Sequence, residues 1–345
     1  MARVLSVDPL RPDVEKIRIA ASAIRRGELV AFPTETVYGL GADAFNAKAS
    51  RLIFEAKGRP ADNPLIVHVA SYDQAASLGE FPEEIAEIAR RVWPGPITFV
   101  VKKRAPLPDV VTAGLPTVAL RCPAHPVALK LIEESGVPIA APSANKAGRP
   151  SPTEASHVLE DLGDKVHIIL DAGRTFFGVE STIIDVTKRP PVLLRPGPFT
   201  LEELRSIFGE IKVPEFARGL GEADVALAPG MKYRHYAPET PLVVVDFDLS
   251  AAVREAHRRG LRVAVLCIMD KCAEGDAVVK LGSDLYEVAR NLYDGLRRVD
   301  KLGVDLALSP AVEERGIGLA IMNRLRKAAG FKVAKTLNEL LDFIG

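Results

Sequence analysis

Many of the side chains in this sequence that could bind a ligand or take part in a reaction lie close together, between positions 31 and 68. The polar residues Pro33-Thr34-Glu35-Thr36 interrupt an apolar run, so we expect a strand to leave the core there and to present hydroxyl and carboxylate groups on a turn. A short helical pattern then ends at Lys57-Gly58-Arg59, where glycine stops the helix and leaves two cations on a loop. Hydroxyl groups and cations in one stretch indicate a binding site for a polar small molecule.

Each of these pieces is common by itself. A glycine turn is usually only a turn, and a Lys-x-Arg pair on a loop is more often a solvated face than an anion site. His68 lies between valines, where a histidine is usually a hydrogen-bonded core residue. Arg121 ends an apolar run, so an ion pair at the end of a strand explains it as well as a ligand contact does.

Four separated motifs occur in a fixed order along the chain. They are PTETVYGLG from Pro33 to Gly41, Lys57-Gly58-Arg59, Ser143-Ala144-Asn145 within APSANKAGRPSPT, and the run from Ala228 to Pro238. The first three together resemble the signature of the YrdC-like family, whose members make threonylcarbamoyl adenylate for tRNA modification. The fourth looks like the signature of the long, two-domain form of that family, so the resemblance spans nearly the full length.

The resemblance implies an L-threonylcarbamoyladenylate synthase, a nucleotidyltransferase that converts L-threonine, bicarbonate and ATP to threonylcarbamoyl-AMP and pyrophosphate. This is the first step in making the threonylcarbamoyladenosine of tRNA. Such chemistry needs a clamp for the threonine carboxylate, partners for the threonine hydroxyl group, and cations that hold the phosphates in line with the attacking carbamate.

For L-threonine the resemblance implies a pocket of five residues: Thr36, His68, Arg121, Ala141 and Ser181. Arg121 is the expected carboxylate clamp, because a planar guanidinium can grip a carboxylate with two hydrogen bonds. Hydroxyl groups suit this pocket, since a site built to bond a substrate hydroxyl rejects analogues that lack it. Serine is harder to reject, because the missing methyl group is worth only about 1 to 3 kcal/mol.

For ATP the resemblance implies nine contacts: Lys57, Arg59, Asn63, Thr117, Ser143, Ser151, Arg195, His235 and Tyr236. Catalysis is expected from prearranged cations and donors that stabilise charge on the phosphates, so no protein nucleophile is required. The residues assigned to this role are Lys57, Arg59, Ser143 and Asn145. Mg²⁺ is expected with ATP, but no cluster of acidic residues marks its ligands, so we expect phosphates and water to hold it.

The composition of the chain excludes some other classes of protein. The chain has 345 residues, of which 48% are hydrophobic, and 45 basic residues balance 45 acidic ones. It is therefore long enough for two domains and lacks the global positive field of a general nucleic-acid binder. Cys122, Cys267 and Cys272 are too few for a disulfide framework, so we expect free thiols, one of them buried at Cys267 and one on a loop at Cys272. No membrane span or signal segment is evident, which predicts a cytoplasmic protein.

Periodicity predicts the elements that must position these residues. Residues 12 to 26 have helical spacing, and short strands with polar ends follow at 65–70, 97–103, 117–123, 138–144, 167–173, 181–186 and 192–197. Helical patterns lie at 83–92, 127–135, 154–162 and 201–208. Many strands follow one another without a helix, so residues 1–212 are expected to form a three-layer α/β domain on a twisted mixed sheet.

The remaining sequence predicts a linker and a second domain. Residues 213–241 are rich in glycine and proline, yet they carry Lys232-Tyr233-Arg234-His235-Tyr236, which a plain tether would not need, so we expect a lid. Residues 242–345 alternate apolar runs with helical patterns at 284–299 and 317–328, which predicts a small, open, Rossmann-like α/β domain. No GxGxxG follows its first strand, so no nucleotide is assigned to it.

Two other functions fit parts of the pattern. One is a double-stranded RNA-binding module, in which the cations would form a track for phosphates. The other is a carbamoyltransferase-type relative, although such relatives carry acylphosphatase and zinc-finger modules that this chain lacks. The synthase interpretation implies a downstream threonylcarbamoyl transferase complex as partner, and a place in the tRNA pathway that requires no direct contact with tRNA.

Overall fold

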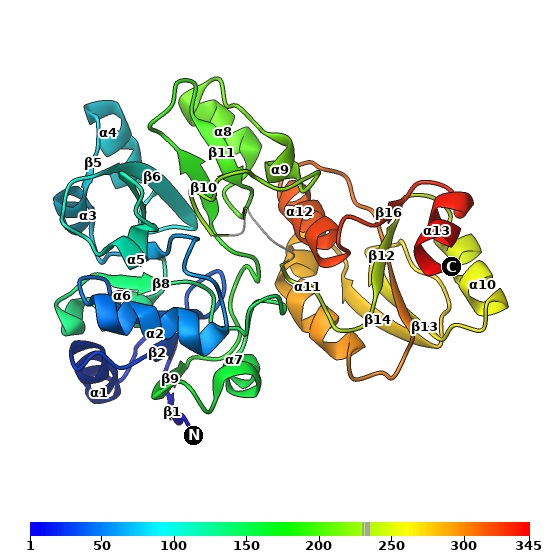
Figure 1. Ribbon diagram of the computed structural model, residues 1–345, viewed down its shortest axis with the longest axis horizontal. Coiled ribbons are helices and arrows are strands. Elements are labelled where there is room, and N and C mark those ends of the chain that lie inside the picture. The colour runs from blue at the N-terminus through cyan, green and yellow to red at the C-terminus, as the bar shows by residue number, and fades with distance from the viewer. Residues whose placement is uncertain (230, 232–234) are drawn as a thin grey trace. The chain divides into compact units, whose positions relative to one another are not determined.

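The computed structural model describes residues 1–229, 231 and 235–345, and Figure 1 shows the path of the chain. The described chain divides into two compact units. The first holds Met1–Ala147, Ser151–Pro214 and Ala223–Lys232, and the second holds Gly148–Pro150, Glu215–Glu222 and Tyr233–Gly345. Each unit is therefore built from several segments of the chain.

The first unit is built on one sheet of eleven strands among the described residues. Ten of them lie in the order β1-β9-β2-β3-β8-β4-β7-β6-β10-β11, and β5 pairs with β6. Neighbouring strands run parallel in some pairs and antiparallel in others, which confirms the expected mixed sheet. The strands are β1 (Arg3–Ser6), β2 (Val30–Phe32), β3 (Gly39–Asp43), β4 (Ile66–His68), β5 (Gly79–Glu80), β6 (Ile97–Lys103), β7 (Thr117–Arg121), β8 (Ile139–Ala141), β9 (Ile168–Asp171), β10 (Thr182–Asp185) and β11 (Val192–Arg195).

Helices of the first unit pack against this sheet and against each other. The carboxylate of Asp13 accepts the Glu15 N–H at 3.0 Å and so caps the first helix, whose apolar face shares a core with α6 and the sheet. The helices are α1 (Val14–Arg25), α2 (Ala47–Lys57), α3 (Tyr72–Leu78), α4 (Glu83–Val92), α5 (Asp109–Thr112), α6 (Pro126–Ser135), α7 (Ala155–Leu162) and α8 (Leu201–Phe208). No helix in the described part of the chain is long and apolar enough to cross a membrane.

One glycine motif has a different role from the expected turn. The turn lies at residues 33–38, and Gly39 already begins β3, which pairs with β2 and β8. A Cβ atom added at Gly41 would lie 2.7 Å from Ile139 Cγ2 and 2.8 Å from Phe32 Cε1. Glycine is therefore needed at position 41 because neighbouring side chains cover the strand, and not because the chain reverses there.

The second unit contains a five-stranded parallel sheet, with strands in the order β14-β13-β15-β12-β16. Figure 1 shows α10 and α13 on one side of this sheet and α11 and α12 on the other. This confirms the small, open α/β fold, including both helices expected near 284–299 and 317–328. The elements are α9 (Glu215–Arg218), β12 (Leu242–Val245), α10 (Leu249–Arg258), β13 (Val263–Ile268), β14 (Ala277–Gly282), α11 (Leu285–Val299), β15 (Leu306–Pro310), α12 (Gly318–Ala328), β16 (Val333–Ala334) and α13 (Leu337–Ile344).

The prediction of free thiols at Cys267 and Cys272 was wrong, because the two residues form a disulfide. β13 ends at Ile268, which bridges back to Lys271 across a tight turn. The turn brings the two cysteine Cα atoms to 4.6 Å, a separation that a disulfide can span. Sequence spacing alone did not reveal this return of the chain. Cys122 is a buried free thiol.

The loop segment Gly148–Pro150 is held by the second unit. Arg297 on α11 is only 2% exposed, and its Nη2 donates a hydrogen bond to the Pro150 carbonyl oxygen at 2.6 Å. The Ala237 N–H donates to the Gly148 carbonyl oxygen at 2.8 Å. The ring of Tyr236 stacks on Tyr293 of the same helix, with ring centres 5.4 Å apart. The two hydrogen bonds hold a three-residue segment whose flanking residues belong to the first unit.

We expect Arg297→Met to lower the free energy of unfolding by about 1 to 3 kcal/mol, because the Pro150 carbonyl loses a charged donor in a buried position. The neighbouring Arg298 is exposed, so Arg298→Met serves as a matched control and is expected to change stability by less than about 0.5 kcal/mol. Urea unfolding followed by circular dichroism measures both. Equal stability of the two variants would contradict the anchoring role.

Candidate active site

The sheet of the first unit brings three of the predicted threonine residues onto adjacent strands. β4 and β7 run parallel, and His68 at the end of β4 is the register partner of Arg121 at the end of β7. β8 lies on the other side of β4, where Ala141 pairs with Ile66. Both His68 and Arg121 are 4% exposed. The carboxyl ends of β4 and β7 therefore carry two buried polar side chains, while antiparallel β8 has Ala141 beside Ile66, at the opposite end of β4.

Arg121 forms a buried ion pair with Glu35 from the turn after β2. Arg121 Nη2 lies 2.7 Å from Glu35 Oε1, and the two side chains are 4% and 7% exposed. Despite this proximity, no residue that the structure describes forms a hydrogen bond with Arg121 Nε, Arg121 Nη2 or either Glu35 carboxylate oxygen. Buried polar atoms without hydrogen bonds are uncommon, and they mark places where a bound polar molecule can supply the missing partners.

The pKa of the His68 imidazole is lowered to about 3, first by burial and then by the positive charge of Arg121. Its Nδ1 lies 3.1 Å from the Ile66 carbonyl oxygen, and its ring meets the edge of Phe32 at 5.9 Å between ring centres. The imidazole is therefore neutral near pH 7, so it offers a hydrogen bond and no charge to a ligand.

Ser181 joins a hydrogen-bonded group that includes the predicted ATP residue Arg195. Arg195 donates from Nη2 to Ser181 Oγ at 3.1 Å and from Nε to the Ser181 carbonyl oxygen at 3.0 Å. Thr98 Oγ1 lies 2.8 Å from Ser181 Oγ. Arg195 thus orients the Ser181 hydroxyl. The role of Thr98 was missed in the sequence, where the only signal was one hydroxyl residue within the apolar run of β6.

The predicted catalytic residues Lys57, Ser143 and Asn145 lie together. Lys57 ends α2, is 3% exposed, and donates from Nζ to the Ser143 carbonyl oxygen and to the Asn145 carbonyl oxygen, the latter at 2.8 Å. Burial, followed by the charge of Arg59, lowers the pKa of Lys57 well below its usual value. The lysine therefore fixes the shape of the Ser-x-Asn turn in addition to bringing a nitrogen donor to it.

The other predicted ATP residues are more scattered. Arg59 Nη2 donates to the Asn63 carbonyl oxygen at 3.2 Å, and the buried Asn63 side-chain amide has no hydrogen-bond partner among the described residues. Ser151 Oγ donates to the carboxylate of Glu180, a partner that the sequence did not suggest. Thr117 begins β7 and so lies about 13 Å along the strand from Arg121, at 3.3 Å per residue.

The remaining predicted residues lie in different parts of the chain. His235 and Tyr236 belong to the second unit, where their rings lie 5.5 Å apart. Lys232, Tyr233 and Arg234 lie outside the described residues. Thr36 lies within the turn of the first unit, buried, with Oγ1 2.9 Å from Thr34 Oγ1. No group of three or more His, Cys, Asp or Glu side chains suited to a metal occurs among the residues that the structure describes.

From the low pKa of His68 we predict how the free energy of unfolding depends on pH. Protonation of this imidazole is favoured only in the unfolded chain, where the pKa is near 6.5, so stability is lost as the pH falls from about 6.5 towards about 3. Between pH 7 and pH 5 the expected loss is about 2 kcal/mol. His68→Gln should remove that part of the pH dependence in urea unfolding, while the same change at exposed His167 should not. An unchanged pH dependence in His68→Gln would refute this assignment.

Two protein-family models match the chain in succession. Residues 22–197 match the model Sua5–YciO–YrdC, described as telomere recombination, and residues 199–330 match the model described as the C-terminal domain of threonylcarbamoyl-AMP synthase. The matched ranges together cover most of the chain without overlap.

Similar proteins and structures agree with these models. Threonylcarbamoyl-AMP synthase of Pyrococcus abyssi is 53% identical over 328 residues, which cover 93% of this chain and 96% of the relative. The Bacillus subtilis protein of the same name is 46% identical over 338 residues, covering 95% and 97%. The crystal structure of P. abyssi Sua5 complexed with L-threonine superposes with a TM-score of 0.92 at 52% identity, covering 96% of this chain and 99% of that one. The chain therefore belongs to the Sua5–YciO–YrdC family, in its two-domain form.

Proposed function

We propose that this protein is an L-threonylcarbamoyladenylate synthase, which makes threonylcarbamoyl-AMP and pyrophosphate from L-threonine, bicarbonate and ATP. The observation that carries the proposal is the buried group at the ends of β4 and β7, where Arg121 and Glu35 keep polar atoms without hydrogen bonds. Relatives that are similar over nearly their whole length carry the name of this activity.

A zwitterionic amino acid complements the Arg121–Glu35 pair. The guanidinium of Arg121, which is paired with Glu35, has the charge and the donors to suit the threonine carboxylate, and the Glu35 carboxylate suits the amine. Neutral His68 lies beside Arg121 and adds a hydrogen bond without adding a charge. The hydroxyl groups of Thr36 and Ser181 are the candidates for the threonine hydroxyl. The structure of a relative with bound L-threonine supports this choice of amino acid.

For the nucleotide, the region of Lys57 and Arg59 is the proposed phosphate site. Once the amine has become a carbamate, its oxygen attacks the α-phosphorus of ATP while the bond to pyrophosphate breaks, so the protein has to align the groups and stabilise charge. Ser143, Asn145, Asn63, Thr117, Ser151 and Arg195 are the proposed neutral and cationic contacts. Mg²⁺ bound to the phosphates would offset their charge, held mainly by phosphate and water oxygens.

The wider assignment is part of the same proposal. The enzyme is a nucleotidyltransferase that works in the cytoplasm and supplies a downstream threonylcarbamoyl transferase for tRNA modification. His235 and Tyr236 remain predicted ATP contacts, and residues 213–241 remain a predicted lid. No observation favours the double-stranded RNA-binding module or the carbamoyltransferase-type relative.

Pyrophosphate release from ATP should require both L-threonine and bicarbonate, because the attacking carbamate contains atoms from each. An enzyme-coupled pyrophosphate assay in bicarbonate-free buffer, with bicarbonate then restored, measures this dependence. Release that continues at the same rate without bicarbonate would contradict the proposed reaction. Release stimulated by duplex RNA instead would favour the RNA-binding alternative.

Arg121→Lys should weaken L-threonine binding about tenfold or more, since the substitution keeps the charge but loses the two-pronged donor, and a charged hydrogen bond contributes about 1.5 to 3 kcal/mol. ATP binding should change little. Isothermal titration calorimetry with each substrate separates the two effects, and exposed Arg189→Lys is the matched control. Weaker ATP binding with unchanged L-threonine binding would instead place Arg121 at the nucleotide.

A further inference from the structure

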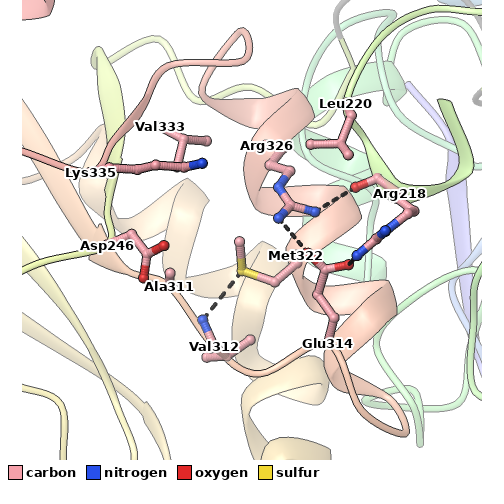
Figure 2. A pocket seen from close by; sticks show the side chains of 10 residues that line it. All are labelled: Arg218, Leu220, Asp246, Ala311, Val312, Glu314, Met322, Arg326, Val333 and Lys335. Atoms are coloured by element: carbon pink, nitrogen blue, oxygen red, sulfur yellow. Dashed lines mark hydrogen bonds and ion pairs between the residues drawn. The ribbon is translucent and has the colours of Figure 1, made fainter. Parts of the chain in front are cut away.

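The second unit contains a pocket that the proposed synthase chemistry does not use. Figure 2 shows it between α12 on one side and the ends of strands on the other. Its volume is about 360 Å³, which lies within the range of about 300 to 1,000 Å³ that is usual for small-molecule sites. All residues that line it belong to the second unit, so the pocket is defined within that unit alone.

The pocket lies at the edge of the parallel sheet where ligands usually bind. Asp246 directly follows β12, Ala311 directly follows β15, and Lys335 directly follows β16, so the carboxyl ends of three strands face it. The neighbouring strands β12 and β15 lead to helices on opposite faces of the sheet, α10 and α12. Such a change of direction leaves a crevice at the strand ends, which is the common ligand position in open α/β sheets.

One wall of the pocket is fixed by ion pairs. Glu314 binds both Arg218, at 3.0 Å between Nη2 and Oε2, and Arg326 through its other oxygen. Arg326 also donates from Nη1 to the Arg218 carbonyl oxygen at 2.7 Å. Two cations sharing one carboxylate leave a net positive charge on this wall. The Arg326 Nε atom is buried and has no hydrogen-bond partner in the described part of the chain.

The opposite wall carries two charges of opposite sign. Figure 2 shows the Asp246 carboxylate and the Lys335 ammonium pointing from the strand ends into the pocket. Neither side chain forms a hydrogen bond or ion pair in the described structure, although other charged residues around the pocket do. Between the walls, the Val312 N–H donates to Met322 Sδ at 3.3 Å, and a thioether is a weak acceptor. A ligand oxygen would be a stronger partner for that N–H.

We propose that this pocket binds a free L-α-amino acid. Asp246 receives the ammonium group, and Lys335 with Arg326 receives the carboxylate, so that both charges of the zwitterion find partners. The apolar side chains of Leu220, Met322 and Val333 contact the side chain of the ligand. This site is separate from the threonine group at Arg121, which lies in the other unit.

The lining of the pocket favours an amino acid over a nucleotide. Among the residues that the structure describes, no aromatic side chain lines the pocket, so these residues offer a base no ring to stack on. The segment from β15 to α12 reads Ala-Val-Glu-Glu-Arg-Gly-Ile and lacks the glycine-rich sequence that lets backbone cradle a diphosphate. Exposed Asp246 and Lys335 on one wall, and the Arg218–Glu314–Arg326 group with its net positive charge on the other, give the charge pattern that complements a zwitterion.

The test is isothermal titration calorimetry of the full-length protein with each standard L-amino acid, and with AMP as a nucleotide probe. The titrations use an Arg121→Lys background, which weakens binding in the first unit. We expect at least one amino acid to bind, and its affinity to fall about tenfold in Asp246→Asn and in Lys335→Gln, because each change removes one charged contact. The N-acetyl derivative of that amino acid should not bind, since it lacks the cation.

Matched controls distinguish the pocket from general changes in charge. Asp342 and Lys280 are exposed residues of the same unit outside the pocket, so Asp342→Asn and Lys280→Gln should leave the affinity unchanged. The proposal is overturned if no amino acid binds, if binding survives both pocket substitutions, or if AMP binds and loses affinity in the pocket variants instead. Pyrophosphate release by the wild-type protein tests the synthase proposal separately, so either proposal can fail without the other.

Discussion

The buried ion pair between Arg121 and Glu35 is the interaction on which the candidate site of the first unit depends. A single charge in this position would cost several kcal/mol, and each side chain makes the other tolerable away from water. The pair joins the end of β7 to the turn after β2. That turn is held further by its backbone, because the Phe177 N–H donates to the Glu35 carbonyl oxygen and the Gly178 N–H donates to the Thr36 carbonyl oxygen. The polar group is thus built into the sheet before any substrate arrives.

A small number of well-placed charged side chains also explains how a protein with no net charge can be suited to anionic substrates. The basic side chains of the site are few and individually placed, as Lys57 is behind the Ser-x-Asn turn. Burial strengthens each such interaction because little water is present to screen it. It also limits what charge is stable there, and for this reason His68 beside Arg121 is neutral. Local burial, more than total charge, therefore determines the electrostatics of the site.

Sequence patterns predicted the elements well where the signal was local. The strand at 97–103 and the helices at 83–92 and 201–208 have the expected bounds, because alternation and helical spacing are properties of neighbouring residues. Contacts between distant segments were not predictable in this way. Nothing near Glu35 indicates its pairing with Arg121, and the crowding that requires glycine at position 41 comes from side chains of β2 and β8. The disulfide was missed for a similar reason, since it depends on a tight return after β13.

The hydrogen bond from Arg297 to Pro150 joins residues 147 positions apart, and this separation affects how the protein matures. A ribosome adds about 5 to 20 residues per second, so on the order of ten seconds pass between the emergence of Pro150 and that of Arg297. During this interval the nascent chain has the Ser-x-Asn turn and Ser151 but lacks the helix that fixes the loop between them. The sheet of the first unit can form earlier, because its last strand ends at Arg195. Newly made chains therefore complete the loop only late in translation, when the second unit folds around it.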